Sequence, residues 1–76
     1  MSRYEKICEY IAQYTSNWTD FQWRQAINNG CIFYTYDDTK KLIQDLFPGY
    51  HKNFFTDINS EIREAEQRFL DDYICQ

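Results

Sequence analysis

The chain has 76 residues, a net charge of −4 and an aromatic content of 20%. That length allows one domain, here residues 1–76, and such a domain buries only about 60% of the surface that its unfolded chain exposes. Seven Tyr, six Phe and two Trp exceed what so small a core can hide, although each buried ring removes about 150–250 Å² from water. We therefore expect an aromatic core and some rings at the surface.

The same composition argues against several classes of protein. No apolar run approaches the length of about 20 residues that crosses a bilayer, and the N-terminal residues lack the apolar core of a signal peptide. An odd number of dispersed cysteines does not suit a disulfide framework. We expect a cytoplasmic protein with reduced thiols and no membrane contact.

The negative charge is concentrated at one end of the chain. Residues 1–55 carry six acids and six bases, whereas residues 56–76 carry six acids and two bases. Because this segment would repel phosphate groups, direct binding of nucleic acid is not expected.

Two helices are predicted in the first 30 residues. Ser2 and Glu5 have capping-box spacing, and the apolar residues behind them predict a helix over residues 3–15. Thr19 and Gln22 form a second candidate box before a helix over residues 20–29. Trp18 precedes this helix and Trp23 lies within it, at the spacing of a hydrophobic staple. Gly30 follows its last residue and is a typical helix stop. The apolar residues of these two helices are Tyr4, Ile7, Cys8, Ile11 and Tyr14, then Phe21, Trp23, Ala26 and Ile27.

Residues 31–36 are all of types that favour β-structure, yet no second strand is predicted in the chain. Two interpretations stay open. The segment is either a buried connector threaded between helices, or a strand completed by another chain, which includes a homodimer of this protein.

Two more helices are predicted after this segment. Asp37, Asp38 and Thr39 are candidate caps for the third, which ends at the Pro48-Gly49 pair. The fourth begins between His51 and Thr56, and its apolar residues recur at spacings of three and four. The fold class is therefore mainly α, a small bundle of three to four helices with one extended aromatic segment. The apolar residues are Leu42, Ile43, Leu46 and Phe47, then Phe55, Ile58, Ile62, Ala65, Phe69, Leu70, Tyr73 and Ile74.

No catalytic, cofactor or metal site is predicted. Cys8, Cys31, Cys75 and His51 could in principle hold zinc, but neighbouring candidates lie at least 20 residues apart in sequence, unlike the close ligand pairs of structural zinc sites. The single histidine has no local Cys–His signature for nucleophilic catalysis. Adjacent acids such as Asp71 and Asp72 point in divergent directions and therefore do not form an acid–base pair.

The last helix carries a charged stripe with two interpretations. Asp57, Glu61, Glu64, Arg68 and Asp71 follow one another at spacings of three and four. They form either the ordinary solvated face of an amphipathic helix or a row of carboxylates that imitates a phosphate backbone. The second interpretation predicts contact with a basic protein surface.

In composition the chain resembles the small, acidic, aromatic-rich proteins that phages and mobile elements encode to block host machinery. The resemblance rests on no motif. It implies a non-enzymatic inhibitor that covers a basic surface of a nucleic-acid-processing or defence complex, in the manner of anti-CRISPR proteins. The alternatives are a homodimeric assembly subunit and a small adaptor that binds a transcription factor. The residues expected to contact the partner are Asp57, Glu61, Glu64, Asp71, Trp18, Trp23, Tyr34 and Tyr36.

Overall fold

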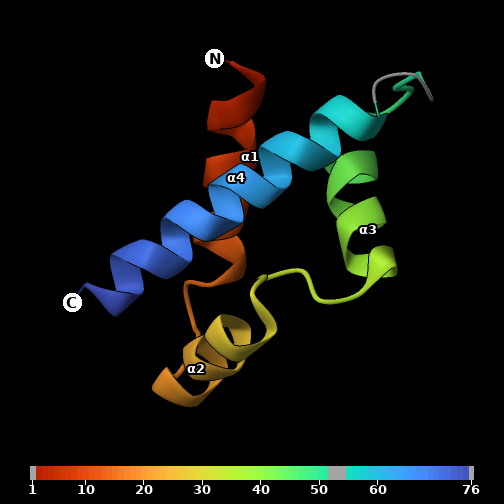
Figure 1. The fold of residues 1–76 in the computed structure, drawn as a ribbon. Coiled ribbons are helices and arrows are strands. Elements are labelled where there is room, and N and C mark those ends of the chain that lie inside the picture. The colour runs from red at the N-terminus through yellow and green to blue at the C-terminus, as the bar shows by residue number, and fades with distance from the viewer. Residues whose placement is uncertain (1, 52–54, 76) are drawn as a thin grey trace.

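The computed structural model describes residues 2–51 and 55–75. This part of the chain contains four helices and no strand, so the prediction of a small, mainly α bundle is confirmed. The long α4 crosses α1, while α2 lies beside the carboxyl-terminal half of α4 and α3 lies near its start (Figure 1). The helices are α1 (Arg3–Tyr14), α2 (Asp20–Asn29), α3 (Tyr36–Leu46) and α4 (Phe55–Ile74).

The first two helices begin where the capping patterns predict. The Ser2 hydroxyl accepts the Glu5 N–H at 3.1 Å, and Thr19 and Gln22 form a complete capping box. The rings of Trp18 and Trp23 meet edge to face at 5.0 Å, which confirms the staple. Gly30 closes α2 in the left-handed conformation, with φ of 77°, which is why glycine suits this position.

Phe21 was expected to pack inward, and that expectation is wrong because its side chain is 68% exposed. Trp23, Ala26 and Ile27 share the inner face of α2, at spacings of three and four. A residue two positions before Trp23 lies about 200° around the helix at 3.6 residues per turn. Phe21 therefore points to solvent.

Residues 31–35 form a connector rather than a strand, and Tyr36 already belongs to α3. Ile32 and Phe33 lie in the core, and the chain enters α3 at Tyr36, after the N-cap Thr35. The predicted caps at residues 37–39 are therefore wrong. Asp37 and Asp38 instead occupy the first turn of α3, where their carboxylates still face the positive end of the helix dipole.

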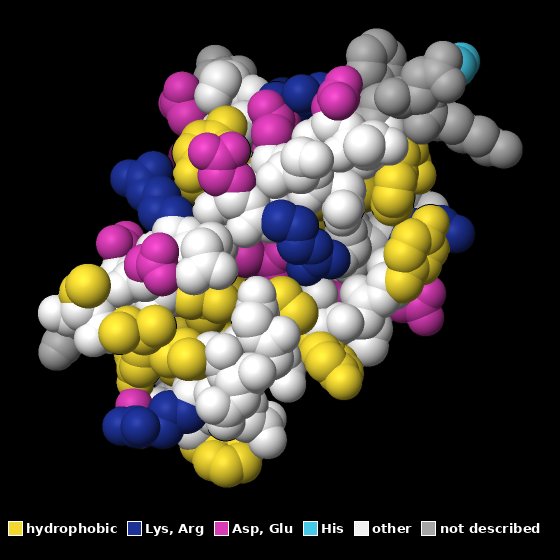
Figure 2. All heavy atoms as spheres, viewed as in Figure 1, with side chains coloured by type: hydrophobic (Ala, Val, Ile, Leu, Met, Phe, Trp, Pro, Cys, Tyr) yellow, Lys and Arg dark blue, Asp and Glu magenta, His cyan; other side chains and the backbone are white. Residues whose placement is uncertain are grey.

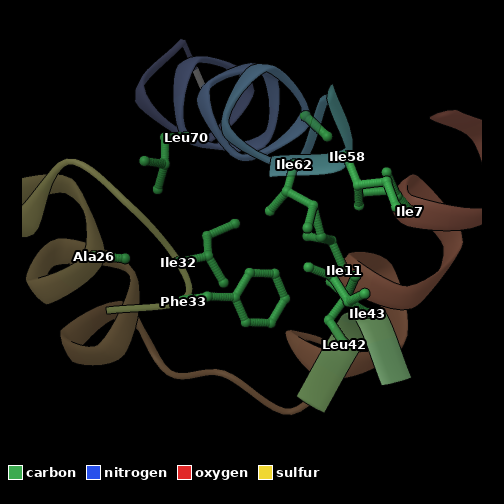
Figure 3. Close-up of a cluster of buried hydrophobic side chains, with 11 residues drawn as sticks. Ile7, Ile11, Ala26, Ile32, Phe33, Leu42, Ile43, Ile58, Ile62 and Leu70 are labelled. Carbon is green, nitrogen blue, oxygen red and sulfur yellow. The ribbon is translucent and has the colours of Figure 1, made fainter. Parts of the chain in front are cut away.

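One core joins all four helices and the connector. The ring of Phe33 lies in the middle of this cluster, with isoleucines of α1 and α4 and the Leu42–Ile43 pair of α3 around it (Figure 3). α4 begins at Phe55, within the predicted window. None of the helices in the described ranges is both long and apolar enough to cross a membrane. The buried apolar residues are Ile7, Ile11, Ala26, Ile32, Phe33, Leu42, Ile43, Ile58, Ile62, Ala65 and Leu70.

Candidate binding surface

A buried carboxylate from α4 holds the connector in place. Glu66 is only 1% exposed, and its Oε2 accepts the backbone N–H groups of Ile32 at 2.5 Å and Phe33 at 2.7 Å. Its Oε1 accepts a hydrogen bond from Arg63 Nη1 at 2.5 Å. An unpaired buried ion costs several kcal/mol, so these bonds are needed for Glu66 to lie in the core as a carboxylate.

Arg63 extends this network to the Phe33 carbonyl and to α3. Its Nη1 donates to the Phe33 carbonyl at 3.4 Å, and its Nη2 donates to Thr39 Oγ1 on α3 at 3.2 Å. We call Glu66 and Arg63, with the groups that they bind, the Glu66 clasp. It fastens both the connector and the first turn of α3 to α4.

The sequence contains a signal for Glu66, which is not among the predicted site residues. Ile58, Ile62, Glu66 and Leu70 recur at intervals of four, so the glutamate stands at a core position of α4. A carboxylate at such a position needs partners from elsewhere in the fold.

The clasp also bears on the idea that residues 31–36 pair with another chain as a strand. The N–H groups of Ile32 and Phe33 are already bound to Glu66, so a pairing strand would have to displace a buried carboxylate. For Ile32 and Phe33, the structure therefore supports the interpretation as a buried connector.

The next residues turn outward. Tyr34 is 70% exposed and Tyr36 is 63% exposed. The ring of Tyr36 lies 5.9 Å from that of Phe55, at the start of α4. Both predicted anchors are therefore available for contact, and they follow directly on backbone that the clasp holds.

The two tryptophans have a different setting. Trp18 and Trp23 are half-buried and belong to a continuous row of rings. Tyr14 meets Trp18 at 6.0 Å, Trp18 meets Trp23 at 5.0 Å, and Trp23 stacks on Tyr73 at 4.9 Å. This row joins α1, α2 and α4, so the tryptophans serve mainly as packing residues.

The acidic stripe of α4 is interleaved with cations. Glu61 is half-buried and forms an ion pair with Arg3 of α1, and the hydrogen bond in that pair raises the pKa of Arg3. A hydrogen bond between Tyr4 and Arg68 raises the pKa of Arg68 in the same way. Acidic and basic side chains alternate over this part of the surface (Figure 2).

The remaining acids of the stripe are exposed. They are Asp57, Glu64 and Asp71, and of these Asp71 accepts a hydrogen bond from the Gln67 side chain at 2.8 Å. The stripe therefore offers separate carboxylates to a partner, rather than the evenly charged row that imitation of a phosphate backbone would require.

A second polar cluster ties α2 to the end of α4. The Tyr73 hydroxyl donates to Asp20 Oδ1, and Arg24 Nε donates to Asp20 Oδ2 at 2.7 Å. These hydrogen bonds lower the pKa of Asp20, with Tyr73 as the largest cause.

This lowered pKa predicts a pH dependence of stability. The contribution of Asp20 is present above its unfolded pKa of about 3.9 and is lost as the pH falls through the lower folded pKa. We expect wild type to exceed Asp20→Asn in Tm at pH 7, and the difference to shrink towards zero near the acid limit. Thermal unfolding of both proteins from pH 7 downward tests this, and a difference independent of pH would refute it.

The candidate metal ligands remain apart. Within the described ranges, no three His, Cys, Asp or Glu side chains are grouped as a metal site would need. Cys8 and Cys31 are half-buried free thiols and Cys75 is an exposed one. Burial raises the pKa of the Cys31 thiol, which disfavours the reactive thiolate.

Comparison of the chain with protein-family models, with curated proteins and with solved structures gives no match.

Proposed function

We propose that this chain is a non-enzymatic protein-binding module, and that it inhibits a nucleic-acid-processing or defence complex by covering a basic surface on it. The observation that supports this most is the exposure of Tyr34 on the connector and of Tyr36 at the first position of α3, after connector residues that are fixed in the core.

Tyrosine is among the residues that dominate binding energy at protein interfaces. A loop that becomes ordered only on binding loses conformational entropy, and this loss weakens the affinity. A loop that is already fixed in the free protein avoids the loss. The Glu66 clasp holds the backbone at Ile32 and Phe33 and so reduces this loss for the rings that follow.

One acidic residue directly follows the two rings in the chain. Asp37 is exposed in the first turn of α3. Asp57 is exposed on α4, but it is two positions after Phe55 and so lies on another side of the helix from the ring that contacts Tyr36. Lys40 and Lys41 are also exposed on α3, so the local charge is mixed. We therefore assign affinity mainly to the tyrosines, and steering towards a basic surface to Asp57, Glu64 and Asp71.

The test is a double variant, Tyr34→Ala with Tyr36→Ala. The partner is first captured from the native host with wild-type protein, purified, and then titrated against each variant. Two interface anchors worth about 2 kcal/mol each correspond to a loss of affinity on the order of 1,000-fold. Undiminished affinity of the double variant would overturn the proposal.

Two further variants sharpen this test. Phe21→Ala removes an equally exposed ring from α2, away from the connector, and should leave affinity unchanged. Reversing the charges of Asp57 and Glu64 should slow association and weaken its salt dependence. Glu61 is unsuitable for this purpose, because its change would break the ion pair with Arg3.

A further inference from the structure

Helices α1 and α3 together carry two tyrosines and two carboxylates that act on one another. Tyr10 and Tyr14 lie one turn apart on α1, with ring centres 6.5 Å apart and an angle of 14° between their planes. The Tyr10 hydroxyl donates to Asp45 Oδ2 on α3 at 3.1 Å. Asp38 stands two turns before Asp45 on the same side of α3. We call these four residues the tyrosine–aspartate cluster.

The Tyr14 ring is held in place and yet reaches solvent. Its centre lies 4.9 Å from that of Phe33 and 6.0 Å from that of Trp18, and Phe33 belongs to the core. Tyr14 is nevertheless 44% exposed. A partner therefore meets a ring whose position is set by contacts within the free protein, which lowers the entropy lost on binding.

The charge that acts on these rings is negative. Burial and the hydrogen bond to Asp45 raise the pKa of Tyr10 to about 12, and the charges of Asp45 and Asp38 act in the same direction. Burial and then the charge of Asp38 raise the pKa of Tyr14. Lys41 lies between the two acids in sequence, but in the described part of the chain neither carboxylate forms an ion pair. Both carboxylates are therefore left to a cation from outside.

We propose that the tyrosine–aspartate cluster binds an arginine side chain of a protein partner. The face of an aromatic ring attracts a cation, and a carboxylate only accepts hydrogen bonds, so the two together select a positively charged donor. The guanidinium group of arginine is planar and weakly hydrated. It stacks on a ring while donating to a carboxylate at its edge, whereas the ammonium group of lysine is a strongly hydrated point charge.

This contact deepens the proposed function and rests on it, since it takes the partner's surface to be basic. Tyr14 contacts Trp18, and Trp18 lines a shallow hollow together with Tyr34. The cluster is therefore continuous with the proposed anchor Tyr34, and it lies within reach of a surface docked on that ring.

The test uses a blocked peptide of five arginines alternating with glycines, titrated against the isotope-labelled protein and followed by NMR. We expect saturable shifts centred on the ring signals of Tyr10 and Tyr14. The same peptide with lysine in place of arginine should bind at least about threefold more weakly, because the ammonium group does not stack.

Two variants locate the contact. Tyr14→Leu keeps an apolar side chain but removes the ring, and it should weaken binding about two- to fivefold. Asp38→Asn with Asp45→Asn removes both charges of the cluster and should weaken binding on the order of tenfold. The matched control is Glu5→Gln with Asp72→Asn, which removes two charges from exposed positions outside the cluster and keeps the capping-box pattern. Its affinity should fall less than about twofold, because exposed charges at a distance are screened.

The arginine contact is overturned by the absence of saturable shifts, or by shifts that centre on the exposed acids of α4. Equal affinity for the lysine peptide, or equal losses in the two double variants, would overturn it as well. The titration uses the protein alone, so its failure leaves the proposed function standing on its own test. Conversely, undiminished partner affinity in the Tyr34 and Tyr36 double variant would overturn that function without altering the result with the arginine peptide.

Discussion

Replacing Glu66 with alanine is expected to destabilise the protein by about 2–6 kcal/mol, because two buried backbone N–H groups lose their acceptor. The change leaves the Arg63 guanidinium without its counter-ion and the N–H groups of Ile32 and Phe33 without an acceptor. Each orphaned buried group adds about 1–3 kcal/mol. A domain has only about 5–15 kcal/mol in all, so this variant should be partly unfolded near physiological temperature.

Urea unfolding of Glu66→Ala beside Glu64→Ala measures this effect. Glu64 is a neighbouring glutamate on the exposed side of α4, and its replacement should change the free energy of unfolding by no more than about 0.5 kcal/mol. Equal midpoints for the two variants would show that the clasp contributes nothing to stability.

Phe33→Ala should have an effect of similar size, about 3–5 kcal/mol. The Phe33 side chain is 1% exposed, and its ring lies 4.9 Å from that of Tyr14 and 6.2 Å from that of Tyr10. Removing it would leave a cavity where α1, α3, α4 and the connector meet, and the surrounding helices cannot close that cavity without losing other contacts.

The adjacent Tyr34→Ala serves as the matched control for this prediction, since it removes a ring of similar size that points to solvent. We expect the Tyr34 variant to unfold within about 0.5 kcal/mol of wild type, while the Phe33 variant shows a much lower denaturation midpoint. If the two changes cost the same, then Phe33 is not the centre of the core.

The helices were predictable because the signals that begin them are local. The cap at Ser2, the capping box at Thr19 and the Trp18–Trp23 staple each involve residues within five positions of one another, and the structure contains all three. The α3 cap was misplaced because several residues in the Thr35 to Thr39 stretch are good caps, and the choice among them depends on how the connector enters the core.

The candidate surface was predictable only in part, because its details depend on contacts between distant residues. Tyr34 and Tyr36 are exposed as expected. Glu61, however, pairs with Arg3, which lies 58 positions away, and no pattern along α4 could show this. Glu66 receives N–H groups from residues 33 and 34 positions away. Its spacing of four residues from Ile62 indicates that it faces the core, but the neighbouring sequence does not indicate which groups it binds.

The buried Glu66 carboxylate fixes the non-helical connector and so presents Tyr34 and Tyr36, which follow the residues that it binds. Amide hydrogen exchange at Ile32 and Phe33, measured by NMR, tests this claim most directly. If Glu66 holds these N–H groups, they should exchange as slowly as the core amides of α4, and much faster in Glu66→Ala under conditions where that variant stays folded. Exchange of the wild-type Ile32 and Phe33 amides as fast as that of solvent-exposed loop amides would contradict the account.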